Sequence, residues 1–152
     1  MSANFNPIYA LTPNVSSVKI TTTAALTRSD GSAANAIGTD QFLAFTSGAS
    51  GSFVQRVRFN PVASAAAINS VATTLRVYLS SVNSGTPTAA NTNLLGEISV
   101  PIISTANSTA ASSYYEIPLN MAIPASRYIL VSQHIAQTTN QSWQATVFGG
   151  DY

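Results

Sequence analysis

Alternation of apolar and polar residues with a period of two recurs along this chain, whereas helical periodicity is almost absent. The clearest case is the segment 74–80, in which Leu75, Val77 and Leu79 share one face. Similar alternation or a short apolar run marks seven further segments: 18–23, 41–46, 53–59, 94–102, 114–119, 128–135 and 143–147. Turn-rich stretches of Gly, Asn, Asp and Ser separate them. The pattern predicts an all-β fold of about eight strands.

Eight short strands in 152 residues fit an antiparallel β-sandwich of the jelly-roll type, in which two sheets pack face to face. No linker or internal repeat divides the chain, so residues 16–152 are predicted to form a single domain. Residues 1–15 contain Asn, Pro and aromatic residues without alternation, and we expect them to form an extended N-terminal arm. The alanine-rich segment 63–72 fits either a short helix or a loop.

Charged residues make up only 7% of the chain, against about 25% in an average soluble domain. A net charge of +1 provides no basic surface for a nucleic acid, so we expect no nucleic-acid partner. A surface of small neutral residues suits close packing against neighbouring subunits, where each charge would need a partner. A monomer solvated by Asn, Ser and Thr would have the same composition, so composition alone separates these two alternatives only weakly.

The side chains that most enzymes use for catalysis are scarce in this chain. It has no cysteine and one histidine, His134, so thiolate sites and sites with several histidines are excluded. His134 falls in the predicted strand 128–135, where a packed or interface histidine is expected, and no Gly-x-Ser-x-Gly motif accompanies it. Glu97 and Glu116 lie on outward strand faces, as solvated carboxylates do. We therefore expect no enzyme activity, no catalytic residue, no cofactor and no metal site.

The apolar residues are dispersed, and no run approaches the ~20 residues that a membrane helix needs. The first 13 residues lack the basic and apolar regions of a secretion signal. We therefore expect a protein that is made in a cytoplasm and has no membrane partner.

Two groups of side chains are candidates for contact with a partner. The first group contains apolar anchors of the arm, which no alternation would bury in the chain's own sheet: Phe5, Ile8, Tyr9 and Leu11. The second group contains three arginines on the outward faces of two predicted strands: Arg56, Arg58 and Arg76. If those strands are neighbours, half of the six positive side chains lie on one surface. Such a surface suits an acidic partner or a neighbouring subunit, because a guanidinium binds a carboxylate through two hydrogen bonds; a solvated face is the alternative.

Alternation in the segment 53–59 also predicts which side chains face the core. It places Phe53, Val57 and Phe59 on one face and Val54 on the other face with the arginines.

Four short motifs are spread in order along most of the chain. They are Asn6-Pro7-Ile8-Tyr9 with Leu11-Thr12-Pro13; Gly51-Ser52-Phe53 with Arg56, Arg58-Phe59 and Pro61; Leu95-Gly96-Glu97-Ile98; and Gly149-Gly150-Asp151-Tyr152. Together they resemble small structural proteins from the head gene regions of tailed bacteriophages. The resemblance implies a jelly-roll-like capsid decoration (cement) protein, often trimeric, on the outer surface of the capsid.

The leading hypothesis is therefore a non-enzymatic virion protein that binds the major capsid protein at the capsid surface and stabilises the head. We expect it to form a homotrimer. The alternative is a phage tail or host-recognition module that binds surface glycans. Aromatic platforms for a glycan could come from Trp143, Tyr78 and Tyr114.

Overall fold

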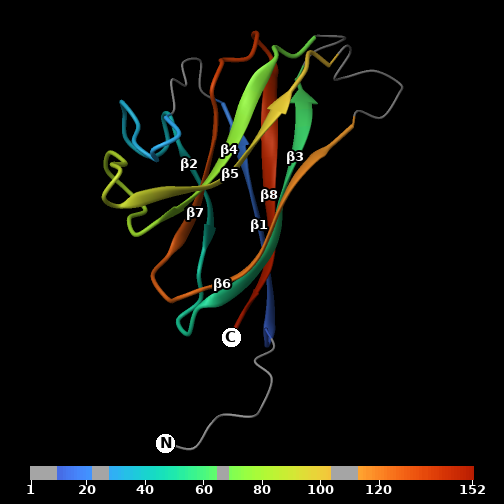
Figure 1. Ribbon diagram of the computed structural model, residues 1–152. Coiled ribbons are helices and arrows are strands. Elements are labelled where there is room, and N and C mark those ends of the chain that lie inside the picture. The colour runs from blue at the N-terminus through green and yellow to red at the C-terminus, as the bar shows by residue number, and fades with distance from the viewer. Residues whose placement is uncertain (1–9, 22–27, 65–68, 104–112) are drawn as a thin grey trace, which may run out of the picture.

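The computed structural model describes residues 10–21, 28–64, 69–103 and 113–152. These residues form eight strands: β1 (Thr12–Ile20), β2 (Phe42–Thr46), β3 (Ser52–Ala63), β4 (Thr73–Ser80), β5 (Thr92–Val100), β6 (Tyr115–Ile123), β7 (Tyr128–Gln133) and β8 (Gln141–Asp151). Figure 1 shows the eight strands, and the prediction of an all-β fold is confirmed. The described part of the chain contains no helix, and hence no helix that could cross a membrane.

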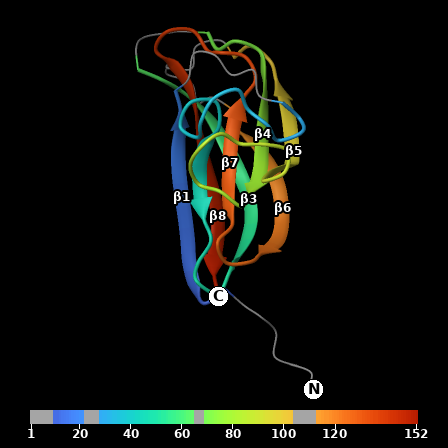
Figure 2. The same ribbon diagram turned by 90° about the vertical axis from the view of Figure 1, so that its left-hand side faces the viewer.

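The strands form two four-stranded antiparallel sheets. Sheet A has the order β1-β8-β3-β6, and sheet B has the order β2-β7-β4-β5. Figure 2 shows sheet B in front of sheet A. The first four strands pair with the last four in reverse order, as β1 with β8, β2 with β7, β3 with β6 and β4 with β5. Pairing of β8 with β3, and of β7 with β4, joins these pairs into sheets.

Side chains from both sheets meet in one apolar core, so the sheets pack face to face as in a β-sandwich. The largest contributions from sheet A are Trp143 and Phe59, and those from sheet B include Phe45 and Leu75. The ring of Tyr115 meets Trp143 edge-on, with ring centroids 5.9 Å apart. Burial of this apolar surface is the dominant stabilising contribution to such a fold, at about 25 cal/mol per Å².

A β-bulge in β3 changes which of its side chains face this core. The pairing of β3 with both neighbours shifts between Val54 and Arg56. Against β8, Gln55 is the extra residue, whereas against β6 the extra residue lies on β6. Val54, Val57 and Phe59 are all fully buried, whereas Phe53 lies on the outside. The predicted grouping of Phe53 with Val57 and Phe59, opposite Val54, is wrong because simple alternation does not allow for an inserted residue.

The first strand begins earlier than the predicted arm of residues 1–15 allows. Thr12 pairs with Asp151 and Val15 pairs with Phe148, so residues 12–15 belong to sheet A. Pro13 is compatible with this position because β1 is an edge strand that pairs on one side only. An edge strand tolerates a residue that lacks a backbone N–H. The boundary at residue 15 is therefore wrong, and residues 1–9 lie outside the described residues.

Candidate interaction surface

The outer face of sheet A carries most of the candidate contact residues within the described ranges. Strand pairing aligns its side chains in three rows across the sheet: Pro13, Gly150 and Phe53; Val15, Phe148 and Arg56; and Ser17, Thr146, Arg58 and Glu116. The first row is apolar, and the charges begin in the second. The surface therefore changes from apolar to charged over the length of a few residues.

Arg56 and Arg58 share one carboxylate on the neighbouring strand β6. The Nε of Arg58 donates a hydrogen bond of 2.7 Å to Oε1 of Glu116, and the Nε of Arg56 lies 3.2 Å from the same oxygen. Arg56 also donates from Nη1 to Oε1 of Gln55, at 2.6 Å. The three charged side chains are each about 30% exposed. Because two guanidinium groups share one carboxylate, this cluster keeps a net positive charge.

Aromatic rings hold the two guanidinium groups in place. The Cζ of Arg56 lies 4.5 Å from the ring centroid of Phe148. The Cζ of Arg58 lies 4.3 Å from the ring centroid of Tyr114 and 5.3 Å from that of Phe148. Each exposed cation–π contact contributes about 0.5–1 kcal/mol. The contacts also orient the guanidinium groups before any partner binds, which reduces the entropy lost on binding.

Arg76 does not belong to this cluster. It lies on β4 in sheet B, whereas Arg56 and Arg58 lie on β3 in sheet A. Its Nε donates to Oε2 of Glu97 at 2.8 Å, and its Nη1 lies 3.2 Å from Nδ1 of His134. The prediction that the three arginines share one surface is wrong, because strands that follow one another in the chain can enter opposite sheets. Whether any of the three contacts a partner stays a prediction.

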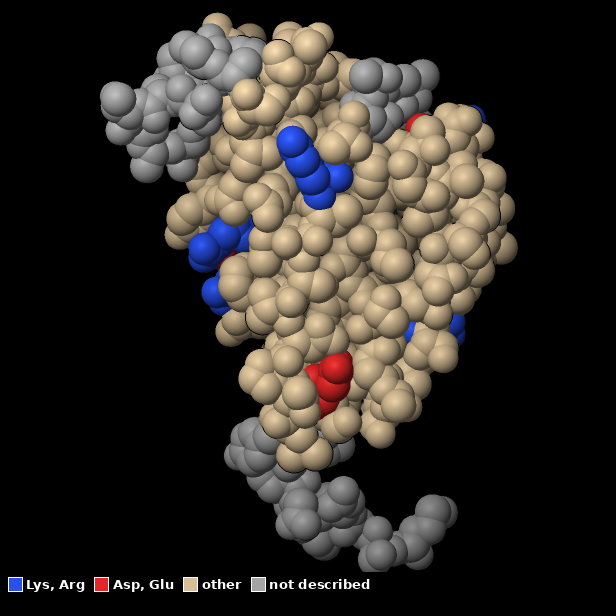
Figure 3. All heavy atoms as spheres, turned by 180° about the vertical axis from the view of Figure 1, so that it is seen from behind, with Lys and Arg blue, Asp and Glu red and all other residues tan. Residues whose placement is uncertain are grey.

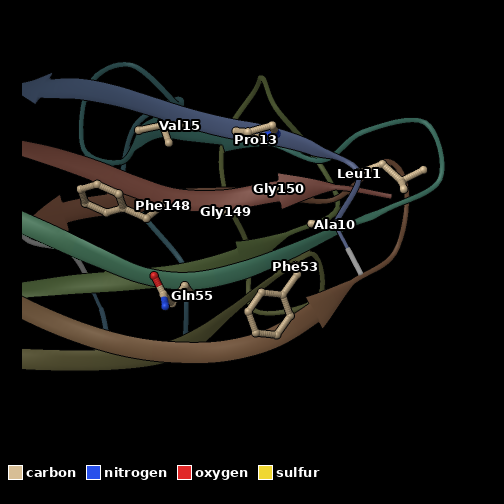
Figure 4. Close-up of a pocket in the computed structure, with 9 residues that line it drawn as sticks. All are labelled: Ala10, Leu11, Pro13, Val15, Phe53, Gln55, Phe148, Gly149 and Gly150. Atoms are coloured by element: carbon tan, nitrogen blue, oxygen red, sulfur yellow. The ribbon is translucent and has the colours of Figure 1, made fainter. Parts of the chain in front are cut away.

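Beside the arginine pair lies an apolar groove with a volume of about 470 Å³. Residues from β1, β3, β8 and the segment before β1 line it: Ala10, Leu11, Pro13, Val15, Phe53, Gln55, Phe148, Gly149 and Gly150. Figure 4 shows Leu11 and Ala10 at one end of the groove and Phe148 and Val15 at the other.

Gly150 lines the groove at a position where there is no room for a side chain. A Cβ on Gly150 would lie 2.6 Å from the Cβ of Ala10, so no larger residue fits there without displacing the start of the described chain. The groove leaves large apolar side chains in contact with water, since Leu11 is 82% exposed and Val15 is 57% exposed. Exposed apolar surface of this kind is typical of interaction sites.

Of the predicted arm anchors, only Leu11 falls within the described residues, and it lines the groove. Phe5, Ile8 and Tyr9 lie outside the described residues. Val15, Phe53 and Phe148 were not predicted as surface residues of this groove. The consecutive glycines 149 and 150 inside a strand were the available signal, because glycine in a strand often marks a close approach of another segment.

The three aromatic residues considered for glycan binding do not form a common platform. Trp143 and Tyr78 are fully buried, and the hydroxyl of Tyr78 donates a hydrogen bond of 3.2 Å to the carbonyl oxygen of Arg28. Tyr114 is 54% exposed, but the guanidinium of Arg58 lies against its ring. A sugar would therefore meet one accessible ring, already in contact with Arg58.

Few charges interrupt the molecular surface. The face seen in Figure 3 is mostly neutral, with small separate areas of positive and negative charge. Among the described residues, no three His, Cys, Asp or Glu side chains gather in a group that could hold a metal ion. Comparison of the chain with protein-family models, curated proteins and solved structures finds no significant match.

Proposed function

We propose that this protein is a capsid decoration protein, which binds the major capsid protein on the outer surface of a phage head and stabilises the head as a homotrimer. The observation that carries the proposal is the outer face of sheet A. There, an apolar groove adjoins two ring-stacked arginines that share one carboxylate. In a chain with only 7% charged residues, this combination suits a protein partner that offers both apolar and acidic side chains.

The protein would act by burying surface against the capsid, with the same interface repeated at many sites of the capsid lattice. A subunit that binds only the assembled capsid stabilises that assembly by mass action, and modest interfaces add up when many copies bind. Neutral Ser, Thr and Ala side chains lower the cost of such packing, because no charge has to be stripped of water without a partner.

We also propose that the fold is a jelly roll preceded by an N-terminal arm. The nested pairing of β1 with β8, β2 with β7, β3 with β6 and β4 with β5 supports this fold. Jelly rolls occur in capsid proteins and in lectins, so the fold alone does not distinguish these functions. The alternative of a tail module that binds glycans has weaker support, because Trp143 and Tyr78 are buried.

Mass spectrometry of purified virions separated into heads and tails tests the location. We expect the protein in the head fraction, and a protein found only in tails would contradict the proposal in favour of host recognition. Detection in neither fraction would contradict both.

Binding to capsids stripped of the protein tests the surface. Replacing Arg56 and Arg58 by Gln together should weaken binding and reduce its salt dependence, because the charged contacts are lost. Lys19→Gln is the matched control, since Lys19 is an exposed cation on β1 of the same sheet. Equal binding of the double variant and the control at both low and high salt would remove the arginine pair from the interface.

A further inference from the structure

We infer that the groove on sheet A binds the N-terminal segment, residues 1–9, of a second copy of this chain. The inference concerns assembly of the protein with itself and does not depend on the proposed capsid function. In the assembled protein the neighbour's segment fills the groove, and the arginine pair beside it remains for contact with the capsid protein. The inference rests on the chemistry of the groove, on the place where the described chain begins, and on the exposure of Leu11.

The chemistry of the segment matches that of the groove. The segment reads Met-Ser-Ala-Asn-Phe-Asn-Pro-Ile-Tyr and contains no charged side chain, so its burial requires no charge to lose water. Phe5, Ile8 and Tyr9 are large enough to fill the space between the side chains of Phe53 and Phe148. Burial of these apolar side chains favours binding because it removes apolar surface from water.

The segment joins the described chain at the groove itself. The backbone N–H of Leu11 donates to the carbonyl oxygen of Asp151 at 2.7 Å, which fixes this residue to β8. Ala10 packs over Gly150 at the end of the groove (Figure 4). Nine residues span up to about 30 Å when extended, which is long enough to reach an adjacent molecule.

Geometry favours the groove of a neighbour over the segment's own groove. Val15 and Phe148 lie at the end of the groove away from Ala10, so a segment bound in its own groove has to turn back on itself. Leu11 is held by its hydrogen bond, and Pro7 has a fixed φ and no N–H, which leaves few residues for that reversal. A neighbour's segment enters without a reversal. Contact with a neighbour also covers Leu11, which is 82% exposed in the single chain.

Two copies that exchange segments reciprocally form an isologous dimer, whereas a segment that enters the groove of the next copy around a ring makes a heterologous contact. Such contacts form a closed ring when the rotation between copies closes, and a trimer is the smallest ring in which no two copies exchange segments reciprocally. Segment exchange is therefore compatible with the proposed homotrimer.

Cysteine cross-linking tests this arrangement cleanly, because the chain has no cysteine of its own. One protein carries Ile8→Cys, and a second, extended by a tag to distinguish its mass, carries Val15→Cys. The two are mixed and oxidised gently. Ser99→Cys, at an exposed position of β5 in sheet B, replaces Val15→Cys in the matched control. Thermal unfolding of each variant checks that the fold is intact.

We expect disulfide-linked heterodimers of the Ile8→Cys and Val15→Cys proteins, in a yield at least roughly tenfold above the Ser99→Cys control because binding raises the effective concentration. A single chain carrying both Ile8→Cys and Val15→Cys distinguishes the other arrangement. If it forms the disulfide within one chain and the mixture gives no heterodimer, the segment occupies its own groove and the inference is wrong. A yield no higher than the control in the mixture, with no internal disulfide, also overturns it.

Discussion

Gly48 and Asp151 are in direct contact at the end of the molecule where β8 terminates. A Cβ added to Gly48 would lie 2.7 Å from Cγ of Asp151. The same carboxylate accepts hydrogen bonds from the hydroxyl of Ser52 on β3 and from the side-chain amide of Asn14 on β1, the latter at 3.0 Å to each oxygen. Asp151 on β8 therefore links the three neighbouring strands of sheet A.

Gly48→Ala should destabilise the fold by about 1–3 kcal/mol, because the added methyl group has to displace the Asp151 side chain from its hydrogen bonds. Urea denaturation measures the free energy of unfolding. Ser50→Ala, an exposed change in the same loop, is the control and should cost less than about 0.5 kcal/mol. Equal stabilities of the two variants would show that Asp151 can move away at no cost.

The stability of the fold should depend on the ionisation of Asp151. The hydrogen bond from Ser52, followed by that from Asn14, lowers the pKa of Asp151 below its usual value of 3.8, although burial opposes the shift. A carboxyl group with a lowered pKa in the folded state contributes stability above its unfolded pKa. That contribution is lost as the pH falls through the folded pKa.

Ser52→Ala removes the first of these hydrogen bonds and should bring the pKa of Asp151 closer to 3.8. Its cost in unfolding free energy should therefore be larger at about pH 7 than at a low pH below the lowered pKa of Asp151, where the carboxyl group is protonated in both proteins. Urea denaturation at both pH values measures this difference, with Ser99→Ala as an exposed control. A cost independent of pH would show that the Ser52 hydroxyl acts only through packing.

Substitutions at the two residues that precede the β3 bulge should rank in the opposite order to that predicted by simple alternation. Val54→Ala should cost about 2 kcal/mol because Val54 is fully buried, whereas Phe53→Ala should cost less than about 1 kcal/mol. Urea denaturation of both variants, in a chain lacking residues 2–9 so that arm contacts do not contribute, makes the comparison. A larger cost for Phe53→Ala would place Phe53, and not Val54, in the core.

Glu116→Gln should lower the free energy of unfolding more when both arginines are present than in the Arg56→Gln background. Without the shared carboxylate, the guanidinium groups of Arg56 and Arg58 repel each other. A double-mutant cycle should give a coupling of about 1 kcal/mol, and added salt should reduce it because salt screens exposed charges. A coupling of zero at low salt would mean that the two arginines act independently of Glu116.

The eight strands, and much of the core within them, could be predicted from the sequence. Leu75 and Val77 are fully buried as alternation requires, and the apolar segment 128–135 contains the fully buried residues Ile129, Leu130 and Val131. These predictions hold because the side chains of a strand point alternately to opposite faces, which is a local property of the backbone.

The candidate surface could be predicted only in part. Arg56 and Arg58 lie on an outward face as predicted, but the groove beside them combines residues from β1, β3 and β8. Its formation depends on the alignment of Pro13, Gly150 and Phe53 across three strands, and no local pattern contains that alignment. Phe53 itself reaches the groove because of an inserted residue in β3 that strand pairing accommodates.

The sequence by itself thus determined the strand content, the outward position of the paired arginines and the scarcity of charge. Only the tertiary structure decided that β3 and β4 enter different sheets, that Trp143 and Tyr78 are buried, and that Val15 and Phe148 remain at the surface. The physical reason is that alternation is set by neighbouring residues. Sheet order and register depend instead on hydrogen bonds between strands that are as far apart in the chain as β1 and β8.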